Sequence, residues 1–251
     1  MCCRSDSETG ASLRFVSCPY QGNYMLQFYF HPTPNPAKVA LLLEELEIPF
    51  EAIAVDTFTG AQHKPEYLKI NPNGKVPAIV DEGVAIFDSH AILLHLSAKH
   101  GKFVPSTPSQ HAEMLSWLLF VATGLSPFSG QAVHFLHHAP EALPYARNRY
   151  LKEVERHYRI LDARLAGSKY LAGDTYSIAD MALWGWGNSA GFVFGEKGLT
   201  DYPHVKRLVD EISARPAAIR AMALKNKLTF KTEFDDETRR ALFPQNASLA
   251  A

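Results

Sequence analysis

Two kinds of hydrophobic pattern alternate over the first hundred residues. Residues 26–30 are an apolar, strand-like run, and residues 50–55 are another. Between them, apolar side chains recur at the i, i+3, i+4, i+7 spacing of one helix face, at Val39, Leu42, Leu43 and Leu46. Because a helix connects the two runs, the pattern predicts a parallel strand-helix-strand unit.

A hairpin and a further helix are predicted next. The apolar runs at 77–80 and 84–87 are joined by Asp81-Glu82-Gly83, and a short connection that contains glycine is typical of antiparallel strands. Apolar residues then recur over 91–96, directly after Asp88-Ser89. Since Asp is a favoured N-cap, a helix should begin there. Together these elements predict a small α/β domain.

The second half of the chain has only helical periodicity. Ser177-Ile178-Ala179-Asp180 fits the capping-box pattern and predicts a buried helix start. A helix near 205–212 should end before Pro216, because the residue before a proline disfavours helical geometry. Other apolar stripes are formed by Met114, Leu115, Leu118, Tyr150, Val154, Tyr158, Leu161 and Leu165. After Lys227 the pattern gives way to charged and then small residues, so we expect a loosely packed tail.

These patterns divide the chain into four parts. We expect a mobile N-terminal extension over residues 1–24, an α/β domain over 25–102, an all-helical domain over 103–230 and a C-terminal tail over 231–251. The extension is polar and without clear periodicity, and translation that begins at Met25 is a related interpretation. The alternative, a first strand at 13–17, would leave the strong strand-like run at 26–30 without a role.

Composition limits the classes of function. The chain has 251 residues, of which 47% are hydrophobic and 20% charged, and its formal net charge is −1. Such a chain can bury a sizeable core, and it lacks the basic excess that favours nucleic acid as a partner. No apolar run approaches the ~20 residues of a membrane span or forms a signal-peptide core. We therefore expect a cytoplasmic enzyme with no nucleic-acid or membrane partner.

Cysteines and histidines offer little chemistry of their own. Cys2, Cys3 and Cys18 are the three cysteines of the chain, all within the first 24 residues, and none has the second cysteine of a redox loop two residues on. A stretch that contains His134, His137 and His138 could suggest a metal. It lacks the ligand spacing of a structured zinc site, so we interpret it as a loop between helices and expect no metal.

The first helix supplies a candidate anion site. Asn is among the best N-cap residues and Pro is favoured at the first helical position, so Asn35-Pro36 predicts the helix start. The first backbone N–H groups of a helix lack partners and the helix dipole is positive there. A thiolate, carboxylate or phosphate would therefore be stabilised. Thr33 and Asn35 add polar side chains at the same place.

Several motifs, in order along the chain, resemble the glutathione transferases. They are Asn73-Gly74-Lys75-Val76-Pro77 before the hairpin, Asp88-Ser89 at the start of the third helix, and Ser177-Ile178-Ala179-Asp180 in the helical half. Pro32-Thr33-Pro34-Asn35 with Lys38 is similar to the nu class, whose better-known members behave as glutathione-dependent disulfide reductases. The resemblance spans roughly residues 25–225. It implies a thioredoxin-like N-terminal domain followed by an all-helical C-terminal domain, in a homodimer.

The resemblance also implies how glutathione would be held. Thr33 and Asn35, or the backbone N–H groups beside them, would donate to the thiolate, the reactive form of a thiol whose pKa in solution is about 8.5. Asp88, where the family more often has Glu, would accept from the γ-glutamyl ammonium, and Ser89 would donate to the carboxylate. The remaining candidates for the first glutathione are the Val76 backbone before a cis Pro77, Gln62 and Lys75. Lys38 is also near the anion site in sequence, and Arg149 matches a position associated with a second glutathione.

The preferred hypothesis is a glutathione-dependent disulfide-bond oxidoreductase. Bound glutathione thiolate would attack a small disulfide and a second glutathione would resolve the mixed disulfide, so the protein itself supplies no cysteine. Two alternatives stay open: a glutathione S-transferase that conjugates small electrophiles or cleaves their thioethers, and a non-catalytic glutathione-binding regulator. The second substrate is not specified, because residues such as Phe120, Phe128 and Trp186 indicate only an apolar pocket.

Overall fold

A four-stranded mixed sheet organises the first half of the chain. The computed structural model describes residues 25–246, so the three cysteines and the expected N-terminal extension lie outside the described residues. The strands are β1 (Leu26–Phe30), β2 (Phe50–Ala54), β3 (Ala78–Asp81) and β4 (Val84–Phe87), in the order β2-β1-β3-β4. β1 and β2 are parallel, whereas β1 with β3 and β3 with β4 are antiparallel. The predicted strand-helix-strand unit and hairpin are confirmed.

Two helices pack on this sheet. α1 (Pro34–Leu46) connects β1 to β2, and α3 (Ser89–His100) follows β4. Between β2 and β3 the chain forms two 3-10 turns, η1 (Thr57–Thr59) and η2 (Ala61–His63), and the short α2 (Pro65–Leu68). The predicted apolar stripe of α1 is buried at every position, that is, at Val39, Leu42, Leu43 and Leu46. The helical spacing therefore identified the face that meets the core.

The loop before β3 is held by two hydrogen bonds to one carbonyl. The Tyr67 hydroxyl and the Asn71 amide both donate to the Lys75 carbonyl oxygen, each at 2.6 Å. The next peptide bond, between Val76 and Pro77, is cis, as the resemblance implied. The backbone of Val76 is thus presented in a defined position at the start of β3.

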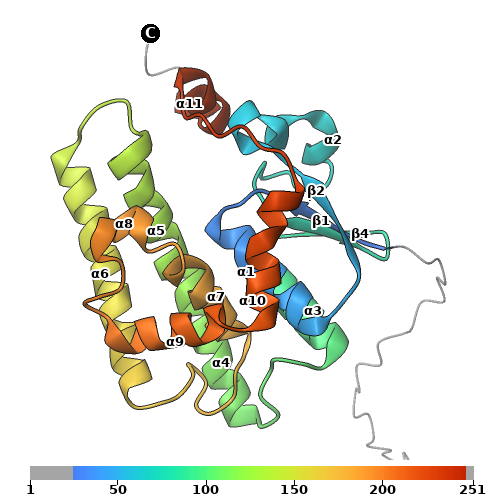
Figure 1. Ribbon diagram of the computed structural model, residues 1–251, viewed down its shortest axis with the longest axis vertical. Helices are drawn as coiled ribbons and strands as arrows, with labels where there is room; N and C mark the ends of the chain where they lie inside the picture. Colours follow the sequence, from blue (N-terminus) through green and yellow to red (C-terminus); the bar gives the residue numbers. More distant parts are fainter. Residues whose placement is uncertain (1–24, 247–251) are drawn as a thin grey trace, which may run out of the picture.

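The second half of the chain is helical, as predicted (Figure 1). α4 (Pro108–Phe120) continues through the π-helical turn η3 (Val121–Leu125) into α5 (Ser126–Val133), which packs against α6 (Pro144–Ala166). Seven further elements follow: α7 (Ile178–Gly187), α8 (Gly191–Phe194), η5 (Gly195–Lys197), α9 (Pro203–Ser213), α10 (Pro216–Ala223), η6 (Leu224–Lys227) and α11 (Asp236–Leu242). No helix within residues 25–246 is long and apolar enough to span a bilayer.

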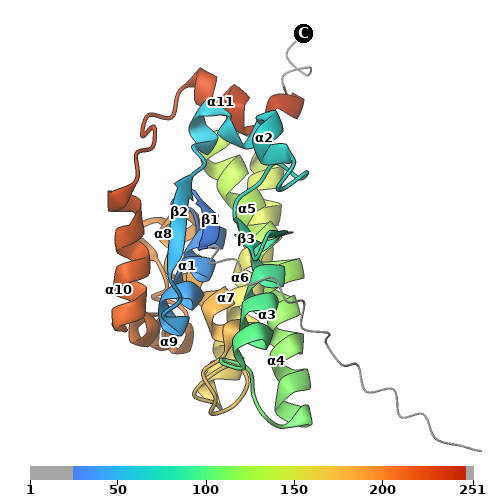
Figure 2. The same ribbon diagram turned by 90° about the vertical axis from the view of Figure 1, so that its right-hand side faces the viewer.

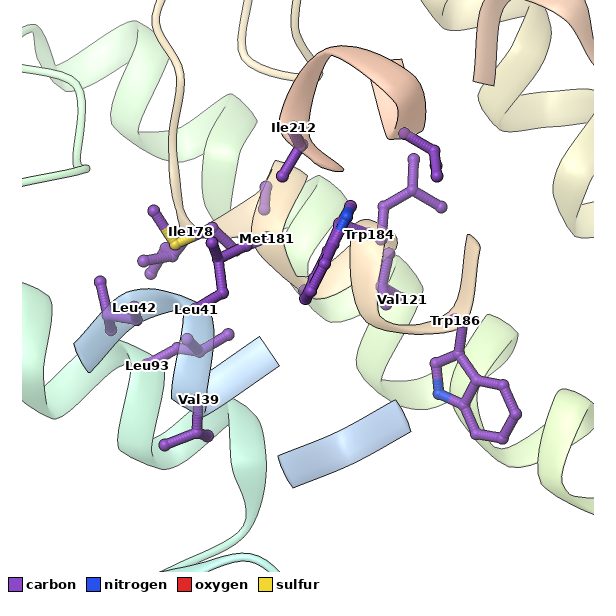
Figure 3. Close-up of a cluster of buried hydrophobic side chains, with 14 of the residues drawn as sticks. Val39, Leu41, Leu42, Leu93, Val121, Ile178, Met181, Trp184, Trp186 and Ile212 are labelled. Carbon is purple, nitrogen blue, oxygen red and sulfur yellow. The ribbon is translucent and has the colours of Figure 1, made fainter. Parts of the chain in front are cut away.

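α7 lies at the centre of the helical half, and every residue from Ile178 to Gly187 is buried. The predicted capping box is present, with the Asp180 carboxylate accepting from the Ser177 N–H at 2.9 Å. Figure 3 shows Ile178 and Met181 beside Leu41 and Leu42 of α1. This shared core fixes α1 against the helical half.

The two halves approach closely at Gly185 of α7. A Cβ atom at this position would lie 2.6 Å from the Pro34 carbonyl oxygen and 3.2 Å from Cε of Lys38. Only glycine, which has no Cβ, allows the first turn of α1 to lie directly on α7. The position of that turn therefore depends on the helical half.

The expected start of α1 is wrong by two residues. The helix begins at Pro34 rather than Pro36, and Thr33 occupies the N-cap position without a capping hydrogen bond from its side chain. Proline suits the first helical position, and Pro36 is tolerated two residues later because the first N–H groups of a helix have no intrahelical partner. Asn35 thus lies inside the first turn and does not cap the helix.

The expectation of a loosely packed tail is also wrong. α11 packs on η1 and lies beside α2 in both views (Figures 1 and 2). Asp235 caps it by accepting from the Thr238 N–H at 2.7 Å, and Thr238 is fully buried. The charges that suggested a solvated tail pair with one another instead, as Lys231 does with Asp235.

Candidate functional site

Loops from several strands meet at one end of the sheet. Tyr29 pairs with Ala78 and Ala78 pairs with Phe87. Continuing these antiparallel registers by one residue places Pro77 opposite Asp88, and by two residues places Val76 opposite the segment that leads from β1 to Thr33. β2 ends at the same edge, because it runs parallel to β1. The fold thus brings the start of α1, the cis-proline loop and the start of α3 together.

The start of α1 presents few donors. Pro34 and Pro36 have no N–H, and the Ala37 N–H donates to the Thr33 carbonyl oxygen at 3.1 Å. Within this first turn, which the structure describes completely, Asn35 supplies the backbone N–H that is left. The side-chain oxygen of Asn35 is buried without a hydrogen-bond partner among residues 25–246. Because a buried polar atom without a partner is unfavourable, this turn suits a polar ligand.

Asp88 caps α3 and carries a charge at the site. Its carboxylate accepts from the His90 N–H at 2.9 Å and the Ala91 N–H at 3.2 Å. The His90 side chain, 3.7 Å away, is the largest of the influences that lower the pKa of Asp88 to about 2, and the two backbone N–H groups add to it. The carboxylate is therefore ionised at neutral pH and, being 63% exposed, is open to a cation.

A buried row of polar side chains runs from Ser89 into the helical half. Ser89 Oγ lies 3.4 Å from His90 Nδ1, and His90 Nε2 lies 3.5 Å from Lys38 Nζ. Lys38 Nζ also donates to Ser126 Oγ of α5 at 3.4 Å. All four side chains are buried, Lys38 completely. The general expectation that lysines face solvent thus fails for Lys38, whereas Lys75 is exposed.

Gln62 is held by the far end of the chain. It is only 2% exposed, and its Nε2 donates to the Ala241 carbonyl oxygen of α11 at 3.0 Å. His63 Nε2 lies 3.1 Å from the same oxygen. The Gln62 side-chain oxygen is buried without a partner among the described residues, as at Asn35. Gln62 lies in η2, before α2, and is positioned by the C-terminal segment.

We call residues 229–243 the C-terminal strap, because they contact both halves of the molecule. On the first half, the Lys231 N–H donates to the Asp56 carboxylate at 2.7 Å, and the Phe230 ring lies 4.9 Å from the His31 ring. On the second half, Arg239 Nε donates to the His138 carbonyl oxygen at 3.1 Å. The strap thus spans the gap between η1 and the end of α5.

Two histidines, His134 and His138, contact aromatic side chains of the strap in the second half of the molecule. His134–His138 form a π-helical turn, η4, that extends α5, so the interpretation of this stretch as a loop is wrong. The Phe234 ring stacks on His138 and the Phe243 ring meets His134, each pair with centroids 4.6 Å apart. Burial, together with the neighbouring positive groups, lowers the pKa of His138 to about 4, and burial also lowers the pKa of His134. Both rings therefore lie neutral against aromatic side chains.

The structure does not bring Arg149 to the other predicted site residues. It lies on the exposed face of α6, where it forms an ion pair with Glu153 at 2.8 Å. The aromatic candidates are placed nearer the interior. Phe120 and Phe128 both pack on the His157 ring, at centroid distances of 4.9 and 5.3 Å, while Trp186 is nearly buried.

Two family models match the chain. The glutathione S-transferase N-terminal domain matches residues 33–99, and the glutathione S-transferase C-terminal domain matches residues 127–216. The chain belongs to the glutathione S-transferase family. The α/β domain followed by a helical domain is the architecture of this family, so the predicted fold class and family are confirmed.

Individual members of the glutathione S-transferase family are similar to this chain in sequence and in structure. The disulfide-bond oxidoreductase YfcG of Escherichia coli is 43% identical over 205 residues, which are 79% of this chain and 94% of the relative. The disulfide-bond oxidoreductase YghU of Escherichia coli is 38% identical over 79% of this chain and 74% of the relative. A family member from Pseudomonas fluorescens, solved with two glutathione molecules bound, has 35% identity and a TM-score of 0.75, covering 81% of this chain and 95% of that one.

In this glutathione S-transferase, sequence reasoning missed two groups of residues. One is the buried contact from His90 through Lys38 to Ser126, and the other is the strap carbonyl of Ala241 that holds Gln62. Neither has a local signature, because each joins segments far apart in the chain. The glycine at position 185, on the fully buried face of a helix, is the sequence signal that a close approach occurs near Lys38.

Proposed function

We propose that this glutathione S-transferase is a glutathione-dependent disulfide-bond oxidoreductase. The observation that carries the proposal is the convergence of the start of α1, the Val76-Pro77 loop and the Asp88-Ser89 pair at one end of the sheet. Residues 25–246 contain no cysteine, so the reactive thiol is assigned to glutathione. Two relatives bear the name disulfide-bond oxidoreductase, which supports this reaction.

We assign the glutathione backbone to the residues around the cis-proline. Asp88 accepts from the γ-glutamyl ammonium, Ser89 and the start of α3 donate to its carboxylate, and the Val76 backbone pairs with the cysteinyl group. Val76 is suited to this task, because it makes no backbone hydrogen bond with residues 25–246. We assign the remaining part of the tripeptide to Gln62 and Lys75, which lie in the segment between β2 and β3.

Thr33 and Asn35 stabilise the thiolate in this scheme. A hydrogen bond to a charged acceptor contributes about 1.5–3 kcal/mol, which corresponds to a fall of roughly one to two units in the thiol pKa. The bound thiolate attacks one sulfur of a small disulfide, a mixed disulfide forms, and the other sulfur leaves as a thiolate. The thiolate of a second glutathione then attacks the glutathione sulfur of the mixed disulfide, so that oxidised glutathione forms and the remaining half of the substrate leaves as a thiolate.

The second glutathione is assigned to the side of Arg149. A guanidinium binds carboxylates well, and glutathione carries two. The Arg149 side chain is half exposed, so its ion pair with Glu153 is partly screened by water and can be exchanged for a ligand carboxylate. The solved relative with two bound glutathione molecules supports the binding of a second glutathione.

The test is turnover of a small organic disulfide by glutathione, followed through the oxidised glutathione formed. The Cys2→Ser, Cys3→Ser, Cys18→Ser triple variant should keep its rate within about twofold, because the thiol belongs to the ligand. Conjugation of electrophiles without disulfide turnover would favour the transferase alternative. Saturable glutathione binding without either reaction would favour a regulator, and loss of activity in the triple variant would contradict the mechanism.

We further propose that the chain acts as a homodimer in the cytoplasm. Val84 and Phe87 on the edge strand β4 are 60% and 42% exposed, and an edge strand with exposed apolar side chains can pair with another chain. The cytoplasm keeps thiols reduced, which the reaction requires. Light scattering after size exclusion should give about twice the chain mass of 27.9 kDa.

A further inference from the structure

Lys38 is a fully buried lysine without a carboxylate in contact. Its Nζ meets a histidine nitrogen, His90 Nε2, and a hydroxyl, Ser126 Oγ, and no ion pair with Lys38 occurs within residues 25–246. A buried ammonium that lacks an anionic partner is strongly unfavourable, so such a group either loses its proton or acquires an anion. The function proposed above does not yet use this residue.

The surroundings of Lys38 contain few charges. α3 contributes His90 and, further away, Asp88, whose attraction acts through space. α5 contributes the neutral Ser126, and α7 contributes Gly185, whose hydrogen leaves room for the Lys38 side chain. Burial is the larger influence and lowers the pKa of Lys38 to about 7, while Asp88 opposes it. At neutral pH the group is therefore balanced between its charged and neutral forms.

The polar row connects this lysine to the carboxylate site. From Lys38 Nζ, one imidazole ring leads to Ser89 Oγ, through separations of 3.5 and 3.4 Å. An anion held by Ser89 and the start of α3 would thus lie next to His90, with Lys38 on the other side of the ring. Ser89 and His90 are buried, so water screens this charge poorly. Asp88 is mostly exposed, so its pairing with the ligand ammonium is screened far more.

We propose that Lys38 is a positioning residue that takes up a proton when the ligand binds and supplies, through His90, the counter-charge for the carboxylate at Ser89. This inference rests on the proposed function, because it takes the γ-glutamyl carboxylate of glutathione as that anion. In the free protein Lys38 is partly neutral, which limits the cost of burying it. In the complex its charged form is favoured and stabilises the bound head group.

The pH dependence follows from the direction of the shift. A nearby anion raises the pKa of Lys38 above about 7, its value in the free protein. If the rise is about two units, binding takes up about 0.8 of a proton at pH 8 and about 0.1 at pH 6, where the lysine is already charged. Glutathione binding should therefore weaken as the pH rises through this range.

The experiment is calorimetric titration with S-methylglutathione, which has no ionisable thiol. The dependence of the measured heat on the ionisation enthalpy of the buffer gives the number of protons taken up. Wild type should take up most of a proton at pH 8 and almost none at pH 6. Lys38→Met, which replaces the ammonium by an apolar chain of similar length, should abolish that difference and bind about tenfold more weakly at pH 6.5.

A matched control is Lys206→Met, the same change at a lysine on the exposed side of α9, where it pairs with Asp210. It should retain the proton uptake of wild type. The ligand amino group is common to all titrations. At pH 8 His90 is neutral, because burial and the Lys38 charge lower its pKa, so the difference between Lys38→Met and wild type at this pH isolates Lys38. Equal proton uptake by Lys38→Met and wild type at pH 8 would overturn this inference and leave the proposed function intact. Absence of any binding heat in wild type would overturn the proposed function as well.

Discussion

Thr33 stands at the N-cap of α1, yet its side chain makes no capping hydrogen bond. Its hydroxyl is therefore dispensable for the helix and free for chemistry. We expect Thr33→Val to lower kcat/KM by about 10- to 100-fold, the equivalent of one hydrogen bond to a charged sulfur, with little change in stability. Steady-state kinetics and thermal unfolding of the same preparation measure the two effects.

A matched threonine provides the control. Thr107 caps α4 by accepting from the Gln110 N–H at 3.3 Å, so Thr107→Val should lower stability by about 1 kcal/mol and leave the rate alone. If Thr33→Val behaves like Thr107→Val, the sulfur is not held at the start of α1.

Asp88 both caps α3 and carries a negative charge at the site. Replacing it by Asn removes the charge and keeps the capping group, so the two roles can be tested separately. Asn caps as well as Asp, so Asp88→Asn should keep the helix start while it loses the partner of the ligand ammonium. Since the Asp88 side chain is 63% exposed, we expect about a tenfold higher Kd for glutathione rather than the larger loss of a desolvated pair. An unchanged Kd by calorimetry would place the ammonium elsewhere.

Asp88→Asn should also change the acid response of the fold. The pKa of Asp88 is about 2 in the folded protein, below its ordinary value of about 3.9. Stabilisation by this carboxylate is therefore complete above pH 4 and is lost as the pH falls towards 2. The asparagine variant should lack that part of the acid transition.

At the scale of elements, the C-terminal strap depends on neutral histidines. Its anchor residue His138 has a pKa lowered to about 4, whereas a solvated imidazole titrates near 6.5. Between these values the open strap binds more protons than the docked one, so docking weakens as the pH falls. We expect amide exchange in residues 236–242 to speed up by about tenfold between pH 7 and pH 5, after correction for intrinsic rates.

His138→Phe tests the cause of this effect. Phenylalanine keeps the stack on Phe234 but cannot be protonated, so most of the pH dependence should disappear. His134, whose pKa burial also lowers, accounts for what remains. Unchanged pH dependence in the variant would assign the effect to another group.

The elements themselves could be predicted well from sequence. Val39, Leu42, Leu43 and Leu46 are buried, and the hairpin and the capping box occur where the patterns placed them, because each depends on neighbours within a few residues. The helix start at Asn35 was wrong because two prolines both suit a first turn. The strap was missed because charges at 233–240 pair within the segment, which sequence alone cannot distinguish from solvation.

The candidate site could be predicted from the sequence only in part. Asp88-Ser89 and Val76-Pro77 have local motifs, and the sheet register brings them together. The row from Ser89 through Lys38 to Ser126 has no motif, because it is assembled from α3, α1 and α5 by the packing of two domains. A lysine in an amphipathic helix is normally assigned to the solvent face, and only the tertiary structure reverses that assignment.

At the scale of the whole molecule, Gly185 sets the distance between the halves. In Gly185→Ala the new methyl group would meet the Pro34 carbonyl oxygen at 2.6 Å. Backbone cannot yield as a side chain can, so α1 must shift on α7. We expect a loss of about 1–3 kcal/mol in stability, with a lower rate because the shifted turn carries Thr33 and Asn35.

Gly130→Ala is the comparison. A Cβ at Gly130 of α5 would meet nothing within 4 Å, so alanine should be neutral or stabilise the helix by up to about 1 kcal/mol. Chemical denaturation and turnover of both variants check the prediction. Equal behaviour of the two would mean that the halves can separate without harm to the site.

The strap also affects whether the two halves stay together after a proteolytic cut between them. α11, from the end of the sequence, docks on η1 near its beginning, and the α1–α7 core joins the same halves. A single cut by trypsin at the exposed Lys102, in the loop between α3 and α4, would therefore leave two fragments clasped together. We expect two bands in a denaturing gel but one particle in native size exclusion, with glutathione affinity retained. The two halves are joined both by the peptide chain and by these noncovalent contacts, so cutting the chain leaves the contacts to hold the fragments together.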